Sequence, residues 1–239
     1  MALTNSVRSL FSRLALIGIA IICIAGCSSI TYRLDRDKSL TTSWGSVFQY
    51  KIDSRWSEPE WSSKVSNDDN FASALYSSDN EDDWLGVSIH AQNPNGSLTK
   101  YSSTSTYGDW IDSQEKNYSQ TAEEQAAWHK EHISKYTSSD PALDDPNHYP
   151  DYKDFSLNQI GDRTINGAEF RLYKMEYTLS YSEKAYATLK EKNPGTSTPQ
   201  QQRMTEFYAI VKDGSHDVEI NTTNSQLLND FLNTLQIKW

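Results

Sequence analysis

Residues 164–180 read TINGAEFRLYKMEYTLS, and this stretch carries the clearest fold signal in the chain. Asn166-Gly167 is a dipeptide that two-residue hairpin turns favour, because both residues tolerate a positive φ angle. After the turn, Phe170 to Ser180 has the alternation of one long strand. That alternation places five side chains on one face: Arg171, Tyr173, Met175, Tyr177 and Leu179. The stretch therefore predicts a hairpin of long antiparallel strands, the first of which opens near Phe155.

A second hairpin and an amphipathic helix follow towards the C-terminus. Residues 205–211 and 217–222 have strand character on either side of Asp213-Gly214, which is another hairpin turn signal. Asn224 or Ser225 then caps a helix. Its apolar residues recur at steps of one, three and four, as expected of a helix face that packs on a sheet: Leu227, Leu228, Phe231, Leu232 and Leu235.

The N-terminal half adds shorter strands. Residues 48–52 alternate between apolar and polar side chains, and a turn at 53–55 follows them. Residues 71–76 and 85–91 predict a further hairpin, which the acidic segment 77–83 closes.

Two helices are expected in the middle of the chain. One begins at Asp109 as its N-cap, and the other begins at Thr121, where Thr-Ala-Glu-Glu matches a capping box. Three prolines and several aspartates predict a loop over 138–154. Together these elements predict an α+β fold, in which an antiparallel β-sheet has helices packed on its faces.

The order of these elements resembles the PsbP-like family. The resemblance rests on FQYKIDSRW (48–56), TINGAEFRLYKMEYTLS (164–180), TEFYAIVKDGSHDVEI (205–220) and LLNDFLNTLQIKW (227–239), and it covers residues 47–239. It implies an α/β/α sandwich built on an antiparallel sheet. It implies little about activity, because relatives of this kind are mostly assembly or interaction proteins and a fold alone does not define a function.

The N-terminus predicts an exported protein. Arg8 and Arg13 precede an apolar run from Leu14 to Ala25, which is short for a membrane-spanning helix and typical of a secretory signal. The run ends in Ile24-Ala25-Gly26-Cys27, which resembles the bacterial lipobox: a branched aliphatic residue, two small residues and cysteine. The resemblance implies that the thiol of Cys27 carries diacylglycerol and that cleavage precedes it. The alternative is a transmembrane anchor with an incidental cysteine.

This reading divides the chain into a signal peptide (1–26), a lipidated cysteine with a flexible tether (27–46) and one globular domain (47–239). Loss of residues 1–26 removes two arginines and no acid, so the formal net charge falls from −10 to −12. Such a charge disfavours nucleic acid and anionic lipid headgroups. We therefore expect a monomer that contacts the membrane through its lipid, with no cofactor and with an envelope protein or a small ligand as its partner.

Two clusters of possible metal ligands are present. His129 and His132 lie three residues apart on the predicted helix, with Asp144, Asp145 and His148 in the loop beyond it. The alternative is that His129 packs in the helix and His132 is solvated. Residues 79–83 are acidic like a calcium loop, but they lack its glycine and its distal glutamate.

We assign no catalytic, cofactor or metal residue, and the expected function is that of a membrane-anchored binding or interaction module of the cell envelope. An exported metal-dependent hydrolase using His129 and His132 is the alternative. The sequence does not distinguish a purely structural envelope role from a binding or interaction module.

Ser28, rather than aspartate, follows the lipobox cysteine. This resembles sorting to the outer membrane in a bacterium with two membranes, and to the outer face of the cell membrane in a bacterium with one.

Overall fold

The computed structural model describes residues 32–41, 47–57, 71–78, 83–91, 106–132, 141–192, 194–195, 198–212 and 216–239. Its strands are β1 (Leu34–Thr41), β2 (Val47–Asp53), β3 (Phe71–Ser77), β4 (Trp84–Ala91), β5 (Asp151–Ile165), β6 (Ala168–Ser180), β7 (Gln201–Lys212), β8 (His216–Thr222) and β9 (Gln236–Lys238). Its helices are α2 (Tyr107–Asn117), α3 (Ala122–His132), α4 (Glu183–Lys192) and α5 (Ser225–Thr234), with short 3-10 turns η1 (Pro141–Asp144) and η2 (Pro146–His148).

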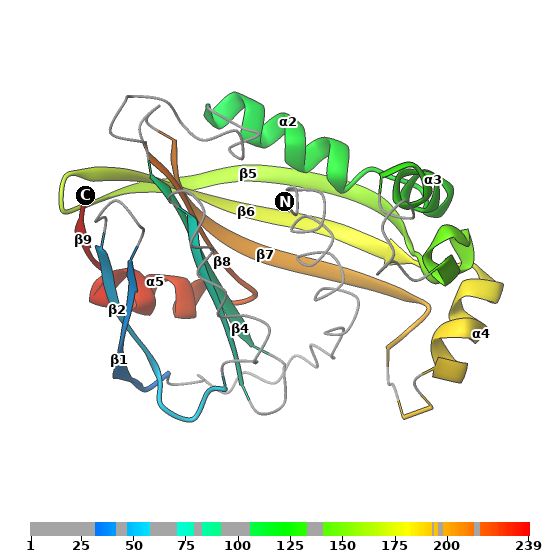
Figure 1. Ribbon diagram of the computed structural model, residues 1–239, viewed down its shortest axis with the longest axis horizontal. Coiled ribbons are helices and arrows are strands. Elements are labelled where there is room, and N and C mark those ends of the chain that lie inside the picture. The colour runs from blue at the N-terminus through cyan, green and yellow to red at the C-terminus, as the bar shows by residue number, and fades with distance from the viewer. Residues whose placement is uncertain are drawn as a thin grey trace. The chain divides into compact units, whose positions relative to one another are not determined.

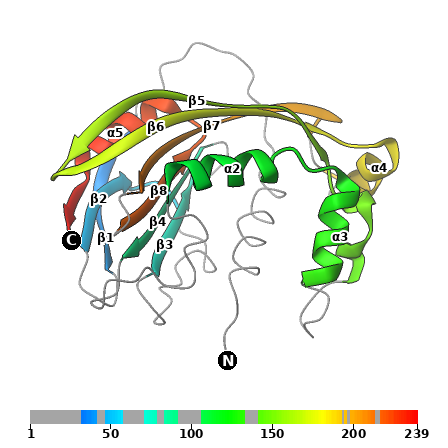
Figure 2. The same cartoon turned by 90° about the horizontal axis from the view of Figure 1, so that it is seen from above.

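The strands form two antiparallel sheets. One has the order β1-β2-β9, and the other has the order β3-β4-β8-β7-β6-β5. Figures 1 and 2 both show β5, β6 and β7 running side by side. Asn166 and Gly167, with φ angles of 49° and 85°, join β5 to β6 as the sequence predicts. The side-chain oxygen of Asn166 also accepts a hydrogen bond from the backbone N–H of Ile237 in β9 (3.0 Å).

By internal contacts the chain divides into two compact units. In the described part of the chain, the first unit comprises residues within 112–156 and 176–204, and the second unit comprises residues within 32–111, 157–175 and 205–239. Helix α2 and strands β5, β6 and β7 each contribute residues to both units. The predicted fold class is confirmed: the protein is an α+β structure of antiparallel sheets with helices packed against them.

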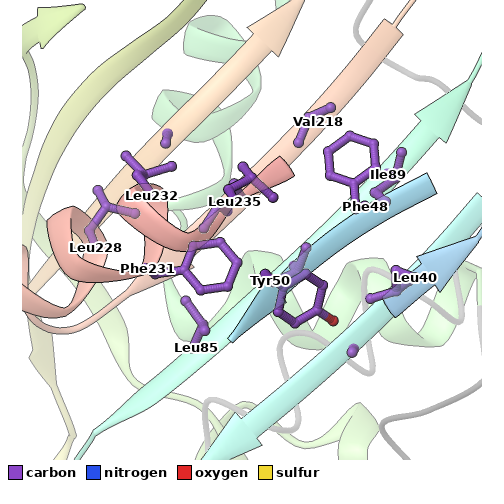
Figure 3. Close-up of a cluster of buried hydrophobic side chains, with 14 of the residues drawn as sticks. Leu40, Phe48, Tyr50, Leu85, Ile89, Val218, Leu228, Phe231, Leu232 and Leu235 are labelled. Carbon is purple, nitrogen blue, oxygen red and sulfur yellow. The ribbon is translucent and has the colours of Figure 1, made fainter. Parts of the chain in front are cut away.

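The core of the second unit lies where α5 packs against β2 and β8. Asn224 caps the helix by accepting hydrogen bonds from the backbone N–H groups of Gln226 and Leu227, so the first of the two predicted caps is the real one. Figure 3 shows the Phe231 ring directed towards Tyr50 and Leu85. Phe231 is fully buried, and its ring centroid lies 5.2 Å from that of Tyr50. All five predicted apolar residues of this helix are buried, as expected.

The first unit is held by a helix cap, a buried amide and an aromatic cluster. The predicted capping box of α3 is present, because Thr121 and Glu124 exchange hydrogen bonds between side chain and backbone. The buried side chain of Gln125 donates to the carbonyl of Pro150 (2.6 Å). The rings of four aromatic residues pack together: Tyr118, Tyr152, Phe155 and Tyr177.

Three expectations about local structure are corrected. Residues 34–41, placed in the predicted tether, form β1, which pairs with β2 from Leu34↔Asp53 to Thr41↔Val47. Residues 138–154 are not a plain loop in their described part, since they contain η1, η2 and the start of β5. Asp109 is not the N-cap of α2, because the helix begins at Tyr107 and Asp109 instead closes a reciprocal capping box with Thr106.

Candidate functional site

The structure does not bring the two predicted histidine ligands together. His129 is 1% exposed, and its Nδ1 lies 2.7 Å from a carboxylate oxygen of Asp144. His132 is exposed, stacks on Trp128 with ring centroids 4.9 Å apart, and makes a hydrogen bond through Nδ1 to the Trp128 carbonyl (2.9 Å). The alternative interpretation, with His129 packed and His132 solvated, is therefore confirmed. Asp145 caps η2 by accepting from the backbone N–H of Asn147.

Within the described ranges, no group of three or more His, Cys, Asp or Glu side chains is arranged to hold a metal ion. Cys27 and residues 79–82 lie outside those ranges, so the lipidation site and most of the calcium-like segment are not tested. Asp83 is described, and it accepts a hydrogen bond from the hydroxyl of Tyr32 (3.0 Å). None of the helices in the described part of the chain combines the length and apolarity needed to cross a bilayer.

A cluster of buried and half-buried charged groups lies on the opposite face of the six-stranded sheet from the apolar core. In β7 and β8, Ala209, Val211, Val218 and Ile220 face that core. Because successive side chains of a strand point to opposite faces, their neighbours point the other way. These neighbours form what we call the α2-side cluster: Glu206, Tyr208, Lys212, Asp217 and Glu219.

Ion pairing and hydrogen bonding hold this cluster together. Lys212 and Asp217 are directly opposed across β7 and β8 and form an ion pair, although their side chains are only 3% and 8% exposed. The hydroxyl of Tyr208 donates to the carboxylate of Glu206 (2.5 Å). Glu206, Lys212 and Asp217 are buried, and Glu219 is half-buried. The charge state of each of these side chains therefore affects the charge states of the others.

The first turns of α2 cover this face of the sheet. The indole of Trp110 packs against Tyr173 and Tyr208, with ring centroids 5.1 and 5.4 Å away. Its Nε1–H donates to the carboxylate of Glu219 (3.1 Å). The hydroxyl of Tyr107 donates to the backbone carbonyl of Glu169 (3.2 Å), so two aromatic side chains anchor the helix to the sheet.

Burial raises the pKa of the Glu219 carboxyl. The negative charges of Asp217 and Glu206 act in the same direction, whereas Lys212 and the bond from Trp110 oppose them. Glu219 therefore keeps its proton to a higher pH than an ordinary glutamate does. A group of this kind can bind or release a proton, and no other chemical step follows from this arrangement.

The α2-side cluster was not foreseen from the sequence. The sequence predicts strands at 205–211 and 217–222 but assigns no burial to their charged residues. The available signal was their position: Glu206 and Lys212 stand at the two ends of the continuous apolar run 207–211, in a strand that lies inside the sheet. A charged residue on the face of the sheet opposite the core becomes buried when a helix such as α2 covers that face.

A search against protein-family models finds no match to this chain, and a search of curated proteins finds none either. The resemblance to the PsbP-like family therefore stays a prediction from the sequence.

Proposed function

We propose that this protein is a bacterial lipoprotein whose folded domain acts as a binding or interaction module at the cell envelope, held there by diacylglycerol on Cys27. The observation that supports the proposal is the sequence Ile24-Ala25-Gly26-Cys27 at the end of an apolar run with a basic flank. Tyr32, five residues after Cys27, is buried in the folded domain.

Replacement of Cys27 by alanine tests the anchor. We expect the Cys27→Ala variant to lose incorporation of a fatty-acid label and to leave the membrane fraction, because the thiol at the lipobox position is missing. Cys23→Ala is the matched control, since Cys23 lies in the segment that the signal peptidase removes, and it should keep both label and membrane association. Membrane retention of Cys27→Ala that only detergent reverses would favour a transmembrane anchor instead.

A further inference from the structure

The distance between the proposed lipid anchor and the folded domain is short. Tyr32 follows Cys27 by five residues, and a fully extended chain spans at most about 3.5 Å per residue, so the reach is roughly 18 Å. Strand β2 alone, from Val47 to Asp53, extends over about 20 Å at 3.4 Å per residue. The connection is therefore shorter than one strand of the domain that it holds.

The domain is fixed from Tyr32 onward. The Tyr32 ring is 8% exposed, meets Trp56 edge to face at 6.1 Å, and donates its hydroxyl to Asp83. The backbone N–H of Arg33 donates to the carboxylate of Asp53 (3.1 Å). These partners lie in two different parts of the chain, the turn at 53–56 and Asp83, so Tyr32 cannot move away from the second unit without local unfolding.

We propose that the end of the second unit formed by Tyr32, Arg33, Ser54, Arg55 and Trp56 faces the headgroup layer of the membrane that carries the lipidated Cys27. This inference rests on the proposed lipid anchor. The sequence predicts a domain on a long flexible tether, whereas the short connection holds the domain close to the bilayer with one end towards it. A binding partner of the domain must then lie close to the membrane surface.

The tether, and not charge, sets this orientation. Arg33 and Arg55 expose 78% and 65% of their side chains, but each forms an ion pair with a neighbouring acid, Asp35 and Asp53. The acidic chain as a whole does not favour adsorption to anionic lipid. We therefore expect the orientation to be the same on zwitterionic vesicles and to persist at high salt.

Single-cysteine labelling tests the orientation, because Cys27 carries lipid and no other cysteine follows it in the chain. Arg33→Cys and Ser54→Cys place a nitroxide at the proximal end. Lys238→Cys is the control, since Lys238 is exposed and pairs with Val47 at the other end of β2. The lipidated protein is reconstituted in phosphatidylcholine vesicles that contain a small fraction of nickel-chelating lipid.

We expect the nickel lipid to relax the labels at positions 33 and 54 several-fold more than the label at 238. Insertion of about 20 Gly-Ser residues after Ser29, with a mean span of about 25 Å, should abolish the difference. Equal relaxation at all positions, or a difference that high salt removes, would overturn the inference while leaving the anchor intact. Failure of the protein to enter vesicles would overturn the proposed anchor itself and the inference with it.

Discussion

Asp53 is a buried acid and Glu219 a half-buried acid of the second unit, and their pKa values are shifted in opposite directions. Asp53 is 0% exposed and accepts from the guanidinium of Arg55 and from the backbone N–H groups of Arg33 and Arg55. Hydrogen bonds from Arg55 hold the pKa of Asp53 at about 2. Glu219 accepts from the neutral indole of Trp110, and burial raises its pKa.

The largest cause differs between the two carboxylates: hydrogen bonds from Arg55 lower the pKa of Asp53, and burial raises the pKa of Glu219. Arg55 is a cation two residues from Asp53, whereas Trp110 lies 109 residues from Glu219 and carries no charge. Ionised Asp53 therefore stabilises the fold, and ionised Glu219 opposes it. A variant of the apolar core of the second unit gives the change in unfolding free energy against which these two electrostatic effects can be compared.

Phe231→Ala should give the largest loss of stability. Phe231 is fully buried in the core, and truncation of such a side chain costs about 3–5 kcal/mol. Urea unfolding monitored by circular dichroism measures the change. Asn229→Ala is the matched control on the exposed face of α5 and should lie within about 0.5 kcal/mol of the parent protein. Equal midpoints for the two variants would mean that α5 does not pack as described.

Asp53→Asn should have an intermediate effect and should change the pH dependence. The shift from 3.8 to about 2 corresponds to about 1–2 kcal/mol after allowance for solvent around the exposed Arg55 guanidinium. Because the folded-state pKa is lowered, this stability is present above pH 3.8 and is lost as the pH falls towards 2. Asp53→Asn should therefore be less stable at neutral pH and lose less stability on acidification.

Asp37→Asn is the control for this change. Asp37 is 86% exposed and lies 3.7 Å from Lys51, so its removal should be almost neutral. If Asp37→Asn and Asp53→Asn give the same acid-unfolding curve, the Arg55 pair does not stabilise the fold.

The contrast between a partner nearby in the sequence, as for Asp53, and a distant one, as for Glu219, also explains which features the sequence predicts well. The Asn166-Gly167 turn, the α3 capping box and the α5 stripe are encoded within a few residues, and all three are present. The Asp53 turn is local in the same sense, since its main partner is two residues away. Local patterns of backbone geometry and periodicity are therefore sufficient for the hairpins and helices of this protein.

Features that depend on distant segments were predicted poorly. Strand β1 has the mixed charge and small polar residues of a tether, and only its pairing with β2 makes it a strand. The α2-side cluster requires the register of β7 and β8 together with the placement of Trp110 over both. A single sequence specifies neither, because cross-strand partners and the helix that covers a sheet face leave no periodic signal of their own.

Glu219→Gln should give the smallest effect and the opposite sign to Asp53→Asn. Because the folded-state pKa of Glu219 is raised, the folded protein keeps this proton after the unfolded chain has released it, so stability falls as the pH rises above the ordinary pKa. The amide of glutamine can still accept from Trp110 and carries no charge, so Glu219→Gln should be as stable as the parent protein near pH 4 and more stable than it near pH 8. Glu169→Gln, an exposed glutamate on β6, is the control and should show no such divergence. If the free energy of unfolding of Glu219→Gln runs parallel to that of the parent protein between pH 4 and pH 8, the α2-side cluster tolerates the ionised carboxylate. The pKa values of Asp53 and Glu219 would then not be shifted in opposite directions.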